Sequence, residues 1–177
     1  MTEDLRSRIL RIKFLIMDVD GVLTDGRIVY GDHGDELKFF DVQDGFGLSL
    51  WRRAGYRTAI ISAKKSRVNV RRARELRIDE LHQKVDDKLK VFEKLSRKFR
   101  IAPEEICYIG DDLMDAPSLL KAGFAVSVPN GVEDVRRLAH YVTERSGGRG
   151  AVRELIELIL KTQGRWEALT ASYLSPQ

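Results

Sequence analysis

The chain has 177 residues, of which 43% are hydrophobic and 33% are charged, and a formal net charge of +4. This length fits one globular domain and leaves too little sequence for a second full domain. No apolar run approaches the roughly 20 residues of a membrane span, so we expect no membrane partner and a cytoplasmic protein. The single cysteine, Cys107, rules out a disulfide within the chain and favours a reducing compartment.

The basic residues do not form a continuous tract. They lie mainly on predicted helices at 64–77 and 88–100, where apolar positions interrupt them. This arrangement favours a solvated basic face that attracts an anionic metabolite over a surface that binds nucleic acid. We therefore expect no nucleic-acid partner.

Short aliphatic runs alternate along the chain with longer segments of helical periodicity. The predicted strands are 14–17, 58–61, 80–82, 106–109, 124–128 and 140–142. The predicted helices are 44–54, 66–76, 87–99, 116–122, 132–138 and 150–160. This alternation predicts an α/β fold, a Rossmann-like, doubly wound parallel sheet flanked by helices.

One segment interrupts the alternation of strands and helices. Residues 27–30 and 36–40 are strand-like and flank a polar turn that contains two glycines. They predict a projecting β-hairpin over 27–40. No large insertion follows this hairpin or precedes the acidic cluster at 110–115, so we expect no large cap domain. A single domain over 1–163 is predicted, followed by a C-terminal tail, 164–177, in which periodicity fades.

Two carboxylates follow the first predicted strand. Asp18 and Asp20 lie in the sequence Asp18-Val-Asp-Gly-Val, and residues i and i+2 of an extended segment point to the same side. Ligand sites of open α/β sheets lie at the carboxyl ends of strands. Two carboxylates there repel each other unless a cation or a proton intervenes. Alone, an acidic loop of this kind more often only caps a helix.

Further polar groups lie at the ends of other predicted strands or at the starts of helices. Ser62 ends one strand, Lys88 lies in the first turn of a helix, and Gly110-Asp-Asp-Leu-Met-Asp115 follows another strand. Each alone has an ordinary interpretation, as a helix-terminal residue or a surface lysine. Together, a hydroxyl, an ammonium and a second carboxylate cluster at separate strand ends indicate one shared site.

In this order, the acidic loop at 18–22, Ser62, Lys88 and the cluster at 110–115 resemble the four motifs of the haloacid dehalogenase superfamily. The resemblance runs from about Lys13 to Arg153. Four longer strings resemble the 3-deoxy-D-manno-octulosonate 8-phosphate phosphatases within that superfamily, namely 18–26, 40–47, 110–115 and 147–154. The resemblance implies hydrolysis of a phosphate monoester to the sugar acid (KDO) and phosphate.

The resemblance assigns four catalytic roles. Asp18 is implied as the nucleophile that forms an aspartyl-phosphate. Asp20 is implied as the group that protonates the leaving sugar oxygen and then activates water. Ser62 and Lys88 are implied to bind the phosphate, and Lys88 also to balance the charge of Asp18.

The resemblance also implies Mg²⁺ as the cofactor. Its ligands on the protein are implied to be Asp18, the backbone carbonyl of Asp20, and Asp111, because Mg²⁺ prefers a few protein oxygens together with substrate oxygens and water. Asp112 and Asp115 are expected to lie behind these ligands and to fix Lys88 or metal-bound water.

The contacts with the sugar acid are carried over from the same resemblance. They fall on Asp41, Asp44, Gly45, Lys64, Arg72, Lys88 and Arg149. Arg72 and Arg149 can each pair with a carboxylate as a charge-assisted fork. Arg149 lies in the glycine-rich turn 146–150, whose backbone N–H groups suit an anion.

Three positions depart from the family's pattern. Asp41 stands where asparagine is usual, and Ser49 where a basic residue is often found. Ser62-Ala-Lys64 replaces the common Thr-Gly-Arg, and lysine cannot reproduce an arginine fork. A phosphatase for a nine-carbon, sialic-type sugar acid 9-phosphate therefore stays open as an alternative. A non-catalytic phosphatase-like assembly domain is the other alternative, although it predicts the loss of Asp18 or Asp20, and both are present.

Without a cap domain, the predicted site is open to solvent in a single chain. In the resembling family, tetramers form with the hairpins packed together at the centre, and a neighbouring subunit covers each site. We therefore expect a homotetramer with residues 28–40 at its interface. A monomeric surface hairpin is the alternative, although an isolated hairpin is only marginally stable.

Overall fold

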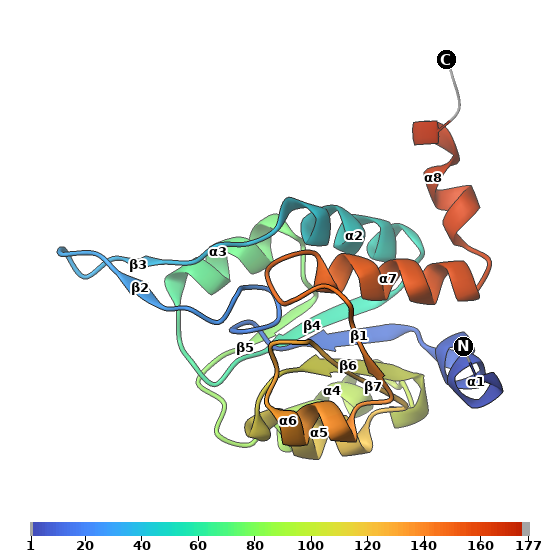
Figure 1. Cartoon of the computed structure of the whole chain (residues 1–177), viewed down its shortest axis with the longest axis horizontal. Coiled ribbons are helices and arrows are strands. Elements are labelled where there is room, and N and C mark those ends of the chain that lie inside the picture. Colours follow the sequence, from blue (N-terminus) through green and yellow to red (C-terminus); the bar gives the residue numbers. More distant parts are fainter. Residues whose placement is uncertain (1, 175–177) are drawn as a thin grey trace.

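The computed structural model describes residues 2–174, which fold around one six-stranded sheet (Figure 1). The strands of this sheet are β1 (Phe14–Met17), β4 (Arg57–Ile61), β5 (Glu80–His82), β6 (Ile106–Gly110), β7 (Phe124–Ser127) and β8 (Tyr141–Val142). Their order is β5-β4-β1-β6-β7-β8, and every neighbouring pair is parallel. The predicted parallel sheet is confirmed.

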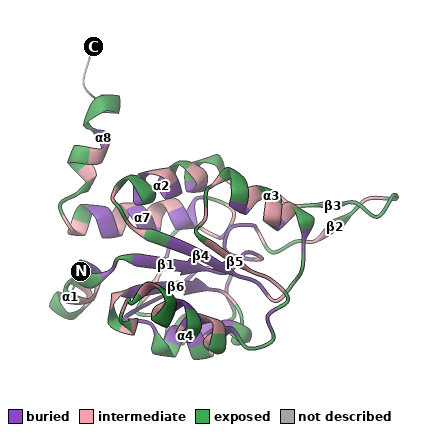
Figure 2. Cartoon of the chain, turned by 180° about the vertical axis from the view of Figure 1, so that it is seen from behind, coloured by how far each residue is buried: buried purple, intermediate pink, exposed green. Residues whose placement is uncertain are grey.

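Helices cover both faces of the sheet, so the strands are buried between two helical layers (Figures 1 and 2). One layer contains α2 (Val42–Arg53), α3 (Arg67–Glu75) and α7 (Ala151–Thr162), and the other α4 (Lys88–Phe99), α5 (Ala116–Lys121) and α6 (Glu133–Leu138). Alternate residues of β1 face opposite layers, with Leu15 and Met17 in one core cluster and Phe14 and Ile16 in the other. The bounds of these strands and helices agree with the predicted ones to within two residues.

The connections between strands place the functional groups at one edge of the sheet. From β1 the chain passes through α2 to β4 on one side, whereas α4 carries it back to β6 on the other side of β1. The connection that leaves β1 runs to β4 on one side, and the connection that leaves β6 runs to β7 on the other side. The carboxyl ends of β1 and β6 therefore form the topological switch point of the sheet. Ligands of doubly wound folds bind at such a point.

The hairpin lies where it was predicted and projects from the body of the molecule (Figure 1). Its strands, β2 (Val29–Tyr30) and β3 (Glu36–Leu37), pair antiparallel and are shorter than the predicted 27–30 and 36–40. No third strand extends this pair within residues 2–174, and an isolated two-stranded ribbon has little to stabilise longer pairing.

Two helices were not predicted from the sequence, α1 (Glu3–Arg11) and α8 (Trp166–Leu174). α1 buries Ile9 against the core, and α8 occupies most of the segment where periodicity fades. The predicted tail runs to residue 177, and 175–177 lie outside the described residues; the domain boundary after 163 stays a prediction. In the part of the chain that the structure describes, no helix is both long and apolar enough to cross a membrane.

Candidate active site

The acidic loop after β1 is held in place by the backbone and by one hydroxyl. The N–H of Asp18 donates to the carbonyl of Ile109 in β6 at 3.1 Å, which fixes the residue at the sheet edge. The hydroxyl oxygen of Thr24 accepts from the N–H groups of Gly21 and Gly26, at 3.4 and 3.3 Å. Asp18 is buried at this position, whereas the side chain of Asp20 is 21% exposed.

Lys88 brings a cation to the buried nucleophile candidate. Its ammonium nitrogen lies 3.1 Å from Oδ2 of Asp18 and 2.7 Å from Oδ1 of Asp115, and its side chain is only 2% exposed. Burial alone lowers the pKa of Lys88, but the carboxylates of Asp18 and Asp115 outweigh that effect and raise it above its usual value. Lys88 is therefore charged at neutral pH.

Asp115 anchors this cation from behind. One of its oxygens accepts from Lys88 and from the hydroxyl of Tyr108, both at 2.7 Å. The other accepts from the N–H groups of Asp111 and Asp112, at 3.1 and 3.2 Å. Both oxygens are therefore engaged within the protein. No hydrogen bond or ion pair joins Asp112 to Lys88. The carboxylate of Asp112 accepts from the N–H of Leu113 at 2.7 Å and caps a short helical turn.

The carboxylates at this edge suit a divalent cation. Oxygens of Asp18, Asp111 and Asp115 lie within 4.8 Å of one another, and Oδ1 of Asp111 is buried without a hydrogen-bond partner. Burial, followed by the charges of Asp18 and Asp115, raises the pKa of Asp111 to about 8. Burial and the charge of Asp115 raise the pKa of Asp18 to about 7. Because Asp115 is already engaged, Asp18 and Asp111 remain for a hard cation such as Mg²⁺.

A glycine allows Asp111 to approach the acidic loop. Gly21 has a φ of +91°, and a Cβ built on it would lie 2.0 Å from Oδ2 of Asp111. Any other residue at position 21 would be strained in its backbone and would displace this carboxylate. The glycine of the Asp-x-Asp-Gly sequence is thus required by the packing of the two acidic segments.

The hollow at this edge has a volume of about 270 Å³. It is lined by Asp18, Asp20, Gly26, Ile28, Ser62, Ala63, Lys64, Lys88, Asp111, Asp112 and Met114. Ser62 is buried at the end of β4, where its oxygen accepts from the N–H of Lys64 at 3.3 Å. The structure therefore gathers every residue predicted to be catalytic or to bind the metal, together with Lys64.

The other predicted sugar contacts lie outside this hollow. Asp41 and Arg149 line a neighbouring hollow of about 420 Å³. Asp44 is 1% exposed and accepts from the N–H of Arg153 at 2.7 Å, which places its carboxylate in the interior. Within a single chain, Asp41, Arg149 and Asp44 therefore lie outside the hollow that contains Asp18, and their role in binding the sugar stays a prediction.

Arg72 and Gly45 pack against each other beside the loop that leads from the hairpin to Asp41 at the start of α2. A guanidinium N–H of Arg72 donates to the carbonyl of Asp41 at 3.2 Å, and the guanidinium lies 5.3 Å from the ring centre of Phe40. A Cβ built on Gly45 would approach that guanidinium to 2.9 Å, so the close packing uses the absence of a side chain. Both residues contribute to the position of the loop, and a contact with the sugar stays a prediction.

Two residues of the site were missed from the sequence. Lys38 lies with its ammonium 2.5 Å from Oδ1 of Asp20. Asn130 donates to the carbonyl of Gly21 and accepts from the N–H of Gly147, both at 2.8 Å, so it ties the acidic loop to the glycine-rich turn. Asn130 lies in a Pro-Asn-Gly turn directly after a strand, and this position at a strand end could have indicated a residue of the site. Lys38 is separated from Asp20 by the hairpin, and the sequence holds no comparable signal.

This fold and this arrangement of two carboxylate clusters, a hydroxyl and a buried lysine define a haloacid dehalogenase-like hydrolase. The model of that family matches residues 47–123. The chain is 40% identical over 170 residues to 3-deoxy-D-manno-octulosonate 8-phosphate phosphatase of Yersinia pestis, covering 96% of this chain and 91% of the relative. The chain belongs to the 3-deoxy-D-manno-octulosonate 8-phosphate phosphatase family.

Solved structures agree with this membership. The phosphatase of the same name from Moraxella catarrhalis, in complex with a magnesium ion, a phosphate ion and a KDO molecule, is 43% identical with a TM-score of 0.95, covering 98% of this chain and 99% of that one. A cobalt-bound phosphatase of this kind from Haemophilus influenzae is 33% identical with a TM-score of 0.89, covering 95% and 99%. The predicted superfamily and fold are confirmed.

Proposed function

We propose that this protein is a Mg²⁺-dependent phosphomonoesterase that hydrolyses 3-deoxy-D-manno-octulosonate 8-phosphate to KDO and phosphate. The observation that carries the proposal is the buried contact of Lys88 with Asp18, 3.1 Å long, beside Asp111 with its unpartnered oxygen. Membership of the family supports the substrate, as does the Moraxella structure with magnesium, phosphate and KDO.

In the first half of the reaction, a carboxylate oxygen of Asp18 attacks phosphorus. The bond between phosphorus and the sugar oxygen breaks, and Asp20 gives its proton to that oxygen. Lys88 holds the attacking carboxylate in place and lies where negative charge gathers. Asp115 prevents Lys88 from turning away, because it accepts from the same ammonium at 2.7 Å.

In the second half, water attacks the phosphorus of the aspartyl-phosphate. Asp20 takes a proton from this water, and the bond between phosphorus and the oxygen of Asp18 breaks. Ser62 lines the hollow, and its hydroxyl donates to a phosphate oxygen. The residues then return to their starting state.

Asp18, the backbone carbonyl of Asp20 and Asp111 would hold the Mg²⁺. When bound, the cation neutralises the negative charge that the carboxylates and the phosphoryl group bring together. The unpartnered oxygen of Asp111 and the raised pKa values of Asp18 and Asp111 support this choice of ligands.

We propose that the enzyme is a homotetramer with the hairpin at its interface. Tyr30, Leu37 and Phe39 of the hairpin are 74%, 51% and 64% exposed in the single chain. Together they form a large apolar surface for a hairpin that faces only solvent. The partners proposed are therefore other copies of the chain and a small phosphorylated sugar acid. A cytoplasmic location is proposed as well, because the sole cysteine, Cys107, is a buried free thiol.

A nine-carbon sugar acid 9-phosphate is the second candidate substrate. Lys64 lines the hollow at the position where the resembling family commonly has arginine, and an ammonium does not reproduce the forked donor of a guanidinium. This substitution changes how a sugar carboxylate is held and leaves the phosphoryl chemistry intact.

The test is phosphate release by the purified protein with Mg²⁺ and with excess chelator. The octulosonate 8-phosphate, a nine-carbon sugar acid 9-phosphate and glucose 6-phosphate are compared at equal concentration. The proposal predicts metal-dependent release that is fastest with the octulosonate ester. Preference for the nine-carbon ester would keep the mechanism and change the substrate, whereas no release from any ester would favour the non-catalytic assembly domain.

A further inference from the structure

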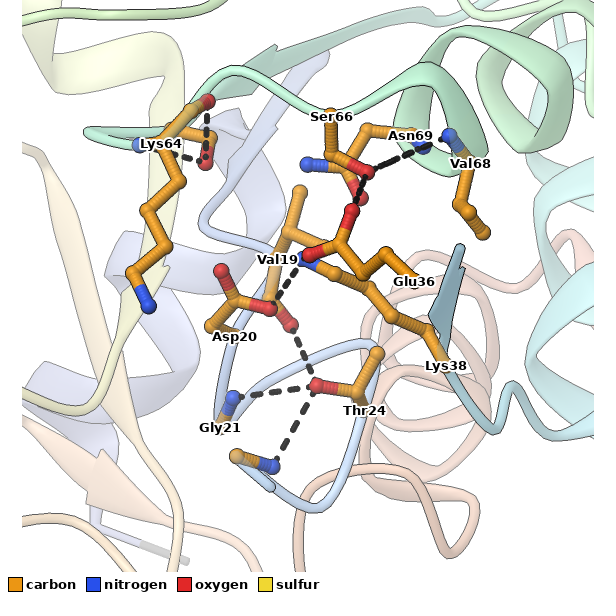
Figure 3. A network of polar contacts seen from close by, with 12 residues as sticks. Val19, Asp20, Gly21, Thr24, Glu36, Lys38, Lys64, Ser66, Val68 and Asn69 are labelled. Carbon is orange, nitrogen blue, oxygen red and sulfur yellow. Dashed lines mark hydrogen bonds and ion pairs between the residues drawn. The ribbon is translucent and has the colours of Figure 1, made fainter. Parts of the chain in front are cut away.

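Lys38 is a buried lysine that faces the proposed acid and base. Its side chain is fully buried, although the hairpin from which it comes is largely exposed. Its ammonium lies 2.5 Å from Oδ1 of Asp20, and Figure 3 shows the two side chains meeting between the hairpin and the acidic loop. A buried ammonium is stabilised only where anions compensate it, so this position is held by specific partners.

Glu36 is the second anionic partner of this lysine. It is the first residue of β3, two positions before Lys38, and its Oε1 lies 3.7 Å from the ammonium. Its other oxygen, Oε2, accepts from the hydroxyl of Ser66 at 2.5 Å. Glu36 therefore has one oxygen toward Lys38 and one fixed to another element, and it cannot rotate freely.

Ser66 connects this pair to a rigid helix. It is the N-cap of α3, and its hydroxyl oxygen accepts from the N–H groups of Val68 and Asn69 at 3.2 and 3.4 Å (Figure 3). Its own N–H donates to the side chain of Gln83 at 2.8 Å. A continuous series of contacts thus runs from the start of α3 through the hairpin to Asp20.

The backbone near Asp20 is fixed separately. Thr24 ties the loop through Gly21 and Gly26, and Asn130 holds the carbonyl of Gly21. What remains free is the orientation of the Asp20 carboxylate, whose side chain is 21% exposed at the hollow. Lys38 donates to Oδ1 of this carboxylate.

We propose that Lys38 is a positioning residue that holds the Asp20 carboxylate toward the leaving oxygen and the attacking water, with Glu36 and Ser66 holding Lys38. The inference rests on the proposed function, because it assumes the acid and base role of Asp20. A carboxylate free to rotate delivers and accepts its proton in only a fraction of encounters, so both halves of the reaction slow without Lys38.

The test compares Lys38→Met with Lys38→Arg on two esters. With the octulosonate ester, Lys38→Met is expected to lower kcat by about 10- to 100-fold, as is usual for the loss of a supporting partner, with KM little changed. Lys38→Arg keeps a cation and is expected to recover activity toward the wild-type value. Lys65→Met changes an exposed lysine nearby and is the matched control for loss of one charge.

The second ester, p-nitrophenyl phosphate, separates positioning from general damage. Its leaving group needs no proton, so Asp18 is phosphorylated at a normal rate in Lys38→Met, while water activation by Asp20 is slow. A rapid burst of nearly one p-nitrophenol per site, followed by a slow phase, is therefore expected. A loss without a burst, equal for both esters, would overturn the proposal, and so would a kcat of Lys38→Met within about twofold of the wild type.

Glu36→Gln is the second variant, to be used if Lys38→Met does not fold. It removes the charge of one partner of Lys38 and preserves the size of the side chain. The same burst and a smaller loss of kcat are expected, and wild-type kinetics would contradict the series of contacts. A wrong substrate in the proposed function is recognised separately. Wild-type protein would then release no phosphate from the octulosonate ester but would still hydrolyse p-nitrophenyl phosphate, and the burst with that ester would still test the role of Lys38.

Discussion

The ammonium nitrogen of Lys88 lies 3.1 Å from Oδ2 of Asp18, in the interior of the protein. The same ammonium contacts Asp115, so one cation lies between two carboxylates that would otherwise repel each other. The contact fixes the direction of the proposed nucleophile before any substrate arrives. Lys88 therefore links the stability of the sheet edge to its chemistry.

Replacement of Lys88 by methionine tests both roles. Lys88→Met leaves two buried carboxylates without their cation, so the free energy of unfolding in chelator should fall by about 3–5 kcal/mol. Its kcat with Mg²⁺ should fall by at least about 100-fold, since a donor to the transition state is lost. Urea unfolding and phosphate release measure the two effects.

Lys90→Met is the matched control for this experiment. Lys90 lies on the same helix with an 82% exposed side chain and pairs with Asp87 at 3.1 Å. An exposed pair of this kind contributes less than about 1 kcal/mol. Equal effects of the two substitutions would contradict the role given to Lys88.

The buried carboxylate of Asp44 should leave a signature in the pH dependence of stability. Burial raises the pKa of Asp44 to about 6, above the value of about 3.9 in an unfolded chain. The folded state therefore holds this proton more tightly, and stability falls as pH rises from about 4 to about 6. Above that range the penalty is constant, at roughly 3 kcal/mol.

Asp44→Asn removes the titration and should abolish this contribution. The difference in unfolding free energy between the variant and the wild type is expected to shift in favour of the variant by roughly 2 kcal/mol between about pH 4 and pH 7, because at pH 4 the carboxyl of the unfolded chain is already about half ionised. Asp32→Asn, at the exposed tip of the hairpin, is the control for loss of one carboxylate. A difference for Asp44→Asn that stays constant with pH would show that its carboxylate is not buried as described.

The arrangement of the sheet followed from local sequence patterns. The apolar runs at 14–17 and 106–109 are short, bounded by polar residues, and too apolar for a surface position, so their assignment needed no tertiary information. The residues after them then had to meet at one edge, because parallel strands bring their carboxyl ends together. For that reason Asp18, Ser62 and Asp111 were placed correctly relative to one another.

Other features depend on contacts that local patterns do not contain. α1 has only isolated apolar residues, and Ile9 becomes a core residue through its packing against α7. The interior position of Asp44 depends on its hydrogen bond with the N–H of Arg153, 109 positions away, and its predicted contact with the sugar stays a prediction. The contact of Lys38 with Asp20 joins residues 18 positions apart across a hairpin whose direction only the folded chain determines.

The identity of the substrate should depend on Lys64, which lines the hollow beside the catalytic residues. Lys64→Ala should raise KM for the sugar acid phosphates by about tenfold or more, the usual effect of losing a hydrogen bond to a charged group. Its effect on glucose 6-phosphate, which has no carboxylate, should be small. The test compares the rise in KM for the octulosonate ester with the rise in KM for glucose 6-phosphate. Equal rises would show that Lys64 does not bind the sugar carboxylate.

Lys64→Arg is the companion variant. It restores the side chain common in the resembling family and supplies a forked donor for a carboxylate. The ratio of kcat/KM for the octulosonate ester to that for the nine-carbon ester should rise. A fall in this ratio would favour the nine-carbon ester as the natural substrate.

The most direct measurement is to trap the covalent intermediate. Wild-type protein is mixed with octulosonate 8-phosphate that carries ³²P and with Mg²⁺, quenched in acid within milliseconds, and digested for peptide mapping. Label is expected on the peptide that contains Asp18, and neither label nor turnover is expected in Asp18→Asn, which should fold normally. Phosphate release by wild-type protein with no label on that peptide, or turnover by Asp18→Asn, would contradict the assignment of Asp18 as nucleophile.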